Sequence, residues 1–381
     1  MTILETENIY KLPWQEYDNP NGWIEPTTYC QINCPGCYRG IDKKDHNPKH
    51  EDLDILKKQI DWFVQKRNVQ TISIAGGEPL LYPYINELVA YCYSKGLRTM
   101  LYTNGVALNK AVLLNLKDVG LTQVLIHIDR YQQRNDLNSN TSINNLKLKY
   151  CDLFRDVTGV LLGFIQPISA DHISEIDRIN QFAIENIDII NLIVYTLYQE
   201  IGWTDETKQN INTSLNVTKV YKHLQLLDNF IPGAYLPAEK NESEFTWLFG
   251  LRIGVPNLSF GYFTSRLYKL IQTKYRRRNG RFLFISRHHT IKPNKLLKFF
   301  WIKHIIKYLS KYVQALIAGK TKSKKIYLQT TLILRGPIKK GDEWDLCQAC
   351  PDRIINNNKL VPSCILNEIE SDKSEHQSVT I

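Results

Sequence analysis

The stretch "TISIAGGEPLLYPYINELVAYCYSKGLRTMLYTNG", residues 71–105, has the pattern of a β-strand, a helix and a second β-strand. The runs TISIAG and RTMLYTNG have the length and β-branched content of buried strands, whereas YINELVAYCYSKG places apolar residues three and four apart. A strand, helix and strand joined by short turns form a right-handed crossover with parallel strands. This unit predicts a parallel sheet covered by helices.

The same alternation continues on both sides of this unit. Six strand-and-helix pairs can be assigned: strands at 22–29, 71–76, 98–105, 122–129, 159–167 and 188–195, and helices at 52–67, 84–96, 110–120, 142–154, 174–187 and 217–230. A full barrel of this type needs two further pairs. The predicted fold class is therefore α/β: a partial (β/α)6 TIM-like barrel with a basic, partly helical insertion and a small C-terminal cysteine-rich extension.

Composition is that of a soluble globular protein, with 43% hydrophobic residues in 381. The beginning, MTILETENIYKLPWQ, does not resemble a secretory signal, and no uninterrupted apolar run is long enough to cross a membrane. We therefore expect a cytoplasmic protein. Thiols stay reduced in that compartment, so closely spaced cysteines predict metal binding rather than disulfides.

Three of the eight cysteines, Cys30, Cys34 and Cys37, lie in one loop, TTYCQINCPGCYRG, after the first predicted strand. Three thiolates can ligate three irons of a 4Fe-4S cluster and leave the fourth iron open. Zinc is an alternative and would need a fourth ligand such as His46 or His50. Three buried structural thiols are the other alternative.

The spacing CxxxCxxC at Cys30, Cys34 and Cys37 resembles the hallmark of the radical S-adenosylmethionine (radical SAM) enzymes. The resemblance implies a 4Fe-4S cluster on these cysteines and S-adenosylmethionine on the open iron. The chain departs from the family in one respect. The residue before the third cysteine is often aromatic in the family, but here it is Gly36, and Tyr38 follows instead.

Further candidate residues follow the predicted strands at their carboxyl ends, where a barrel gathers its chemistry. In the family, the segment GGEP after the second strand holds the methionyl amino group, and later strand ends contact the ribose or carboxylate. By this resemblance the expected cofactor-binding residues are Gly76, Gly77, Glu78, Pro79, Asn104 and Asp129. Alternatively, GGEP and Asn104 are turn residues, and His127 is a hydrogen-bonded barrel residue.

A second cysteine group, Cys347, Cys350 and Cys364, lies in DLCQACPDRIINNNKLVPSC. It resembles the auxiliary-cluster regions called SPASM or twitch domains, with fewer cysteines than usual. An auxiliary 4Fe-4S cluster here would have an open iron or take a fourth ligand such as Asp352, Cys151 or Cys92. Zinc is the alternative.

Positive charge is concentrated in one segment. Residues 245–341 contain 22 Lys and Arg and no Asp or Glu, whereas the rest of the chain has 26 basic and 38 acidic residues. Within this segment, 295–320 reads as an amphipathic helix, with Lys303, Lys307 and Lys311 on one side and Trp301, Ile302, Ile305, Leu309 and Val313 on the other. The first interpretation is a solvated lysine face on a helix packed against the barrel. Peripheral contact with an anionic membrane through 265–325 is the second, and a nucleic-acid partner is the third.

These observations favour a radical SAM enzyme, an oxidoreductase or transferase. It would form a 5'-deoxyadenosyl radical that abstracts hydrogen from a lipid or isoprenoid, a peptide or a small metabolite. An external electron donor such as flavodoxin or ferredoxin would be needed. The alternative is a nucleic-acid-binding protein with zinc at both cysteine groups. The expected organisation is an N-terminal extension (1–20), the barrel (21–235), a basic variable region (236–340), a cysteine knuckle (341–368) and a disordered tail (369–381).

Overall fold

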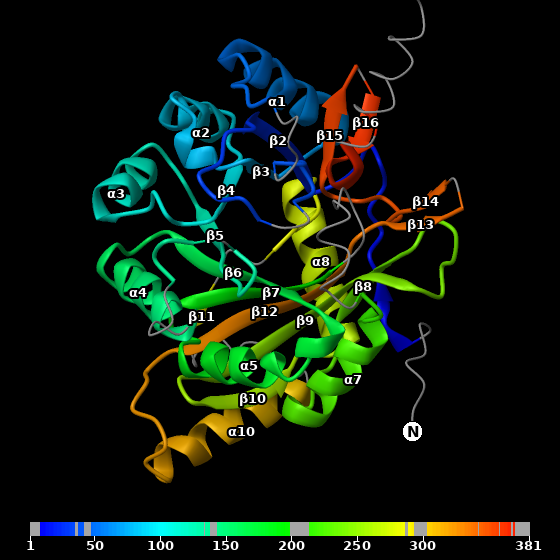
Figure 1. The fold of residues 1–381 in the computed structure, drawn as a ribbon. Helices are drawn as coiled ribbons and strands as arrows, with labels where there is room; N and C mark the ends of the chain where they lie inside the picture. Colours follow the sequence, from blue (N-terminus) through cyan, green and yellow to red (C-terminus); the bar gives the residue numbers. More distant parts are fainter. Residues whose placement is uncertain are drawn as a thin grey trace, which may run out of the picture.

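One continuous 12-stranded sheet forms the frame of the molecule (Figure 1). The structure, a computed structural model, describes residues 8–34, 37–41, 47–132, 134–137, 143–198, 213–285, 289–292, 303–341, 343–357, 359–366 and 369. Along the sheet the strands follow the order β1-β8-β9-β12-β7-β6-β5-β4-β3-β2. Strands β10 and β11 pair with β9 and β12 outside this path.

The six predicted strand-and-helix pairs are confirmed. The strands are β2 (Asn21–Thr27), β3 (Thr71–Gly76), β4 (Arg98–Thr103), β5 (Gln123–His127), β6 (Leu161–Ile168) and β7 (Ile190–Leu197). The helices are α1 (Leu53–Arg67), α2 (Ile85–Ser94), α3 (Lys110–Asp118), α4 (Ile143–Asp156), α5 (Glu175–Glu185) and α7 (Val217–Asp228). Neighbouring strands from β2 to β7 are all parallel. This is the partial TIM-like barrel that the sequence predicts.

Local sequence determines where several of these helices begin and end. Asp52 precedes α1 and accepts hydrogen bonds from the backbone N–H groups of Asp54 and Ile55, and Asn109 caps α3 in the same way. Helix α1 ends at Asn68, which adopts the left-handed conformation. Side-chain acceptors at the N-cap satisfy amide groups that a helix leaves unpaired. The short polar stretches between apolar runs therefore fix the crossover lengths.

The sheet continues beyond β7 with strands from the region 236–340. Strand β12 (Ile326–Arg335) lies parallel to β7, and β9 (Phe245–Val255) lies antiparallel to β12. Strand β8 (Ala234–Pro237) pairs with β9, and β1 (Tyr10–Lys11) pairs with β8. Strands β10 (Leu258–Tyr262) and β11 (Thr290–Ile291) complete the sheet. The predicted variable region and N-terminal extension thus contribute strands to the barrel sheet itself.

Helix α8 (Ser265–Asn279) and the segment after it close the barrel at the N-terminal ends of the strands. Gln70, just before β3, donates to the hydroxyl of Tyr275, and Arg98 at the start of β4 donates to the carbonyl of Ile285. Phe284 packs against Trp247 inside the barrel. The basic region therefore supplies the floor of the barrel interior.

The C-terminal cysteine segment bridges the gap between the two edges of the sheet. On one side, Gln348 N–H donates to the carbonyl of Pro237, at the end of β8. On the other side, Asn19 donates to the carbonyl of Ala349, and the fully buried Arg67 donates to the carbonyl of Cys350. This part of the chain contains two small hairpins. The first, β13 (Ile338–Lys340) with β14 (Glu343–Asp345), precedes Cys347, and the second, β15 (Arg353–Asn356) with β16 (Lys359–Pro362), lies between Cys350 and Cys364. Figure 1 shows the second hairpin beside β2 and α1.

The predicted amphipathic helix is present as α10 (Lys303–Ile317), and residues 295–302, with Trp301 and Ile302, lie outside the described residues. Its buried face is formed by Ile305, Tyr308, Tyr312 and Ala315. Val313, predicted on the apolar side, is instead 48% exposed, because the two tyrosines occupy the contact with Phe260, Phe263 and Tyr262. Within the described residues no helix is long and apolar enough to cross a membrane.

Candidate active site

A cavity of about 390 Å³ opens at the carboxyl ends of the barrel strands and continues into the barrel. It is lined by both groups of cysteines: Cys30, Cys34 and Cys37 from the loop after β2, and Cys347, Cys350 and Cys364 from the C-terminal segment. Gly76, Gly77, Asn104 and Asp129 line it as well. The sequence predicts each of these residues as part of a site, and the fold brings them to one cavity.

The two glycines after β3 allow the cysteine loop to pass directly over the strand end. A Cβ atom on Gly77 would lie 2.2 Å from the carbonyl oxygen of Tyr29, and Gly76 has a φ of +105° that favours glycine. The Gly77 N–H donates to Thr27 O at 2.8 Å, and the Glu78 N–H donates to Tyr29 O at 2.7 Å. The backbone of GGEP therefore holds the start of the cysteine loop.

Glu78 is fully buried and is not among the described residues that line the cavity. Its carboxylate accepts hydrogen bonds from the hydroxyl of Thr103, the N–H of Asn104 and the N–H of Leu80. Burial raises the pKa of this carboxyl, and the three donors oppose that rise. Pro79 is buried as the first residue of a short 3-10 helix. In this structure Glu78 joins the end of β3 to the end of β4, and its predicted cofactor contact remains a prediction.

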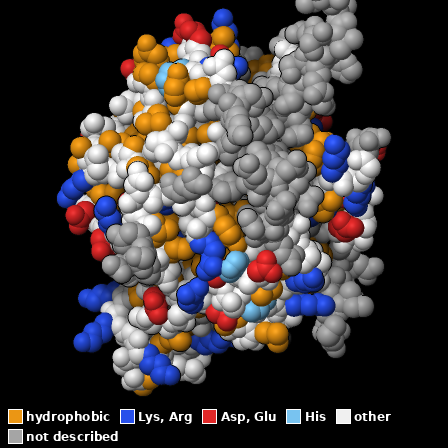
Figure 2. Space-filling model, in the orientation of Figure 1, with side chains coloured by type: hydrophobic (Ala, Val, Ile, Leu, Met, Phe, Trp, Pro, Cys, Tyr) orange, Lys and Arg blue, Asp and Glu red, His pale blue; other side chains and the backbone are white. Residues whose placement is uncertain are grey.

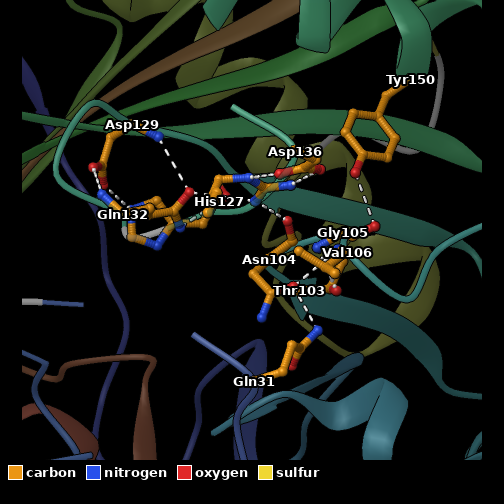
Figure 3. Close-up of polar contacts among 11 residues, drawn as sticks. Gln31, Thr103, Asn104, Gly105, Val106, His127, Asp129, Gln132, Asp136 and Tyr150 are labelled. Carbon is orange, nitrogen blue, oxygen red and sulfur yellow. Dashed lines mark hydrogen bonds and ion pairs between the residues drawn. The ribbon is translucent and has the colours of Figure 1, made fainter. Parts of the chain in front are cut away.

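Asn104 connects the end of β4 to the cysteine loop (Figure 3). Its side-chain oxygen accepts from Gln31 and from the N–H of Val106, and its amide nitrogen lies 3.6 Å from Cys30 Sγ. The hydrogen bond from Val106 is typical of a turn residue, which is the alternative interpretation that the sequence gives for Asn104. The same side chain also contacts the first cysteine, so the two interpretations are compatible.

Asp129 is held in one orientation by its own loop (Figure 3). Its carboxylate accepts from the backbone N–H groups of Tyr131 and Gln132 and lies 2.6 Å from His127 Nε2. Burial acts to raise the pKa of Asp129, but His127 and the backbone donors bring it below its ordinary value. A fixed carboxylate at the cavity edge suits a hydroxyl or ammonium donor of a ligand.

Arg134 is a site residue that the sequence analysis did not identify. Its buried guanidinium donates to the carbonyl of Asn104 and pairs with Asp136. It thereby fixes the strand end that carries Asn104. The segment that contains Arg134 has no strand or helix pattern, so only tertiary contacts reveal its position.

A buried ion pair anchors the other end of the cysteine loop. Arg39 Nε lies 2.9 Å from Glu25 on β2, and the same carboxylate accepts from Tyr38 and Trp23. Burial, with the charge of Glu25, raises the pKa of Tyr38 well above its usual range. Tyr38 packs in the same small apolar cluster as Trp23, and both side chains line the cavity. Gly36, the departure from the family pattern, lies outside the described residues.

The donor set of the loop fits an iron–sulfur cluster. Cys30, Cys34 and Cys37 are not joined in disulfides, are partly accessible, and all line one cavity. Burial raises the pKa of the Cys30 and Cys34 thiols, so binding a metal would displace protons from them. Among the described residues, no three His, Cys, Asp or Glu side chains are gathered for a single metal ion. His50, suggested as a zinc ligand, stacks on Tyr29, and His46 lies outside the described residues.

The C-terminal cysteines share their part of the cavity with Asp352. Asp352 is partly buried and accepts a hydrogen bond from Asn21, and the thiols of Cys347 and Cys350 interact with each other. Cys92 on α2 and Cys151 on α4 are fully buried in the core outside the barrel. Of the three suggested fourth ligands, Asp352 alone lines the cavity among the described residues.

Comparison with known proteins agrees with the cysteine spacing. Residues 24–151 match the sequence model of the radical SAM superfamily. The chain is 27% identical over 191 residues to the 7,8-dihydro-6-hydroxymethylpterin dimethyltransferase of Methanocaldococcus jannaschii, covering 48% of this chain and 37% of that protein. It is 34% identical over 113 residues to a GTP 3',8-cyclase of Helicobacter pylori, and this match covers 28% of this chain and 33% of that protein. The chain thus spans about a third of the length of these relatives.

Solved structures with a related arrangement include Streptococcus suis SuiB bound to S-adenosylmethionine and methylornithine synthase (PylB). The match to SuiB has a TM-score of 0.44 and 19% sequence identity, and it covers 55% of this chain and 47% of the SuiB chain. The match to PylB has a TM-score of 0.42 and 15% sequence identity, and it covers 56% of this chain and 63% of the PylB chain.

Proposed function

Because the chain contains a radical SAM domain, at residues 24–151, we propose that it is an enzyme that reductively cleaves S-adenosylmethionine to initiate a radical reaction. The observation that carries the proposal is the meeting of Cys30, Cys34 and Cys37 with the glycines of GGEP at one cavity. The family match favours this function over a zinc-stabilised nucleic-acid-binding protein. The two relatives are named as a methyltransferase and a cyclase, so they differ in reaction type. The proposal therefore includes both an oxidoreductase and a transferase reaction.

In this proposal the three thiolates hold a 4Fe-4S cluster. When bound, the cluster would supply one electron to the sulfonium of S-adenosylmethionine and yield a 5'-deoxyadenosyl radical. The protein's part is positional. The Gly77 and Glu78 backbone bonds and the Glu25–Arg39 pair hold the two ends of the cysteine loop, and Asn104 and Asp129 present fixed polar groups. The barrel walls would keep water from the radical.

The electron would come from an external donor such as flavodoxin or ferredoxin. A shallow surface hollow of about 240 Å³ lies on the loop, lined by residues that include Tyr29, Cys30, Ile32 and Pro48. Cys30 lines both this hollow and the central cavity. The hollow therefore offers a short path from the surface to the first cluster ligand.

We assign the second cysteine group a metal centre of its own, an auxiliary 4Fe-4S cluster, with zinc as the alternative. Cys347, Cys350 and Cys364 supply three thiols, and Asp352 supplies a partly buried carboxylate beside them. Their place in the same cavity puts such a centre next to the substrate. Cys347→Ala is then expected to leave some S-adenosylmethionine cleavage intact and to impair substrate turnover. Iron and zinc analysis of the reconstituted variant, compared with wild type, distinguishes the two metals.

The primary test is formation of 5'-deoxyadenosine by anaerobically reconstituted protein reduced with dithionite. The wild type should form it, and the variant with Cys30, Cys34 and Cys37 all changed to Ala should not. Cys92→Ala is the matched control, because Cys92 is buried in the core away from the cavity. Equal product from the triple variant would refute the assignment.

A further inference from the structure

The cavity wall beyond the cysteine loop is apolar. Tyr102 on β4, Ile165 and Pro167 on β6 and Leu334 on β12 are only partly buried, and each lines the cavity. Inward positions of a barrel are normally filled by packed side chains. Here these inward positions leave apolar surface accessible inside the molecule, which is the property of a site for an apolar ligand.

The floor below this wall is also apolar. Leu125, Leu192, Val194, Trp247 and Phe284 come from four different segments, and all of them are buried and line the cavity. The indole N–H of Trp247 has no hydrogen-bond partner among the described residues. This part of the cavity therefore offers a ligand hydrocarbon contacts.

Charged groups on the cavity wall already have partners. Arg335 lies within 3.4 Å of Asp345 and within 3.3 Å of Glu244. Asp129 is bound by His127, and Asp352 by Asn21. A polyphosphate or an amino acid zwitterion entering the apolar part would lose hydration without gaining a counter-charge.

A peptide substrate fits the same wall poorly. The strands that form it are paired on both sides within the sheet, so their backbone groups are already used. Peptide amide groups buried among leucine, isoleucine and tryptophan side chains would lack hydrogen-bond partners. The wall favours a ligand with few polar groups along its length.

We infer that the substrate inserts an uncharged hydrocarbon chain, of the lipid or isoprenoid type, into the barrel interior, against the inward-facing side chains of the strands. The inference rests on the proposed radical function in one respect, because the ligand is called a substrate of that reaction. The binding of a hydrocarbon chain is argued from the cavity lining alone. The cysteine end of the cavity remains for the cofactor, and the chain of the ligand lies against Ile165, Leu334 and Trp247.

Binding of uncharged chain alcohols tests this inference. Anaerobic protein reconstituted with iron and sulfide and supplied with S-adenosylmethionine is titrated with farnesol and with 1-hexadecanol, using tryptophan fluorescence and calorimetry. GTP and a glycine–serine hexapeptide serve as polar probes. At least one alcohol should bind about tenfold more tightly than either polar probe. Tighter binding of GTP or the hexapeptide than of both alcohols would overturn the inference.

Variants of the wall locate the binding. Leu334→Gln keeps the size of the side chain and adds polarity, whereas Ile165→Trp fills the space. Each should weaken binding of the alcohol about tenfold. Leu226→Trp, on the exposed surface of α7, is the control and should bind normally. Unchanged binding in both folded wall variants would place the alcohol elsewhere and refute the inference.

The proposed function is monitored separately in the same samples. Formation of 5'-deoxyadenosine without added alcohol reports on S-adenosylmethionine cleavage alone. Protein that cleaves the cofactor but prefers GTP refutes only the hydrocarbon inference. Protein that binds farnesol but never cleaves the cofactor refutes only the radical function.

Discussion

Arg67 ties the C-terminal cysteine segment to the barrel. Its fully buried guanidinium donates to the backbone carbonyls of Glu16, Asn21, Cys350 and Pro351. Burial lowers the pKa of Arg67 to about 10, which still leaves it charged at neutral pH. One side chain therefore connects the end of α1, the start of β2 and the second cysteine group.

Arg67→Met should destabilise the fold and loosen this segment. Each buried acceptor left without a donor costs about 1–3 kcal/mol, so the total loss should be about 3 kcal/mol or more. Urea unfolding measures the loss, and the rate of thiol modification of Cys350 measures the loosening. Arg266→Met, at an exposed position of α8, is the control. Equal stability of the two variants would show that the hydrogen bonds of Arg67 to these four carbonyls, the Arg67 clamp, are dispensable.

Lys147 is a buried cation on α4 whose ammonium donates to Gln166. Burial lowers its pKa to about 8 from 10.5, although Asp129 and Glu175, with the Cys151 thiol, act in the opposite direction. The folded-state pKa lies below the unfolded one, so the charged form destabilises the fold. That cost is fully present below about pH 8 and fades as pH rises towards 10.5.

Lys147→Met should therefore raise the unfolding temperature at pH 7, and the gain should shrink at pH 10. The pKa gap corresponds to about 3 kcal/mol, from which the lost bond to Gln166 subtracts about 1 kcal/mol. Thermal unfolding at both pH values measures the difference. Lys149→Met changes an exposed lysine of the same helix and should have little effect at either pH. A gain of equal size at pH 7 and pH 10 would contradict the assignment.

At the scale of elements, the junction of β2 and β3 determines whether the cysteine loop can form. Gly77→Ala would press a methyl group against the Tyr29 carbonyl, and relief of that overlap costs about 1–3 kcal/mol. The loop would then separate from the strand end, because the two backbone bonds to Thr27 and Tyr29 hold it there. We expect the variant to lose most of its cluster after reconstitution, as measured by iron and sulfide content.

Gly96→Ala separates this effect from ordinary backbone strain. Gly96 also has a positive φ, +68°, but nothing lies within 4 Å of the position that its Cβ would occupy. The substitution should cost about 1–2 kcal/mol in stability and leave cluster loading intact. Equal cluster loss in both glycine variants would mean that stability alone limits reconstitution.

For the whole molecule, helix α10 and the C-terminal hairpin of the cysteine segment lie at different ends. Figure 1 shows α10 at the end of the molecule opposite the hairpin of β15 and β16, and Figure 2 shows Lys and Arg side chains around the place of α10. Ile306, Val313, Leu316 and Ile317 are exposed on this helix. Exposed aliphatic side chains among lysines suit an anionic membrane surface.

Membrane contact through α10 remains a prediction, and flotation with liposomes tests it. Wild-type protein should float with vesicles that contain phosphatidylserine and lose this association at high salt, because screening weakens the attraction. Val313→Asp and Ile317→Asp should reduce flotation, whereas Leu226→Asp, equally exposed on α7, should not. Indifference of the wild type to anionic lipid would favour the alternative of a solvated lysine face.

The sequence by itself determines the six strand-and-helix pairs and the two cysteine groups. Apolar periodicity and residues at element ends, such as Asp52 and Gly77, act over a few neighbouring positions. They can therefore be recognised from the sequence without knowledge of the fold. The same local logic places GGEP and Asn104 at strand ends, and from there predicts that they share a cavity with Cys30.

Only the tertiary structure decides how the barrel is completed. The pairing of β12 with β7, the floor formed by Phe284, and the Arg67 clamp join residues far apart in the chain. No local pattern marks such partners, because burial and hydrogen bonding depend on which surfaces meet in space. For that reason the sequence predicts the cysteines individually, whereas the meeting of both groups in one apolar cavity emerges only from the fold.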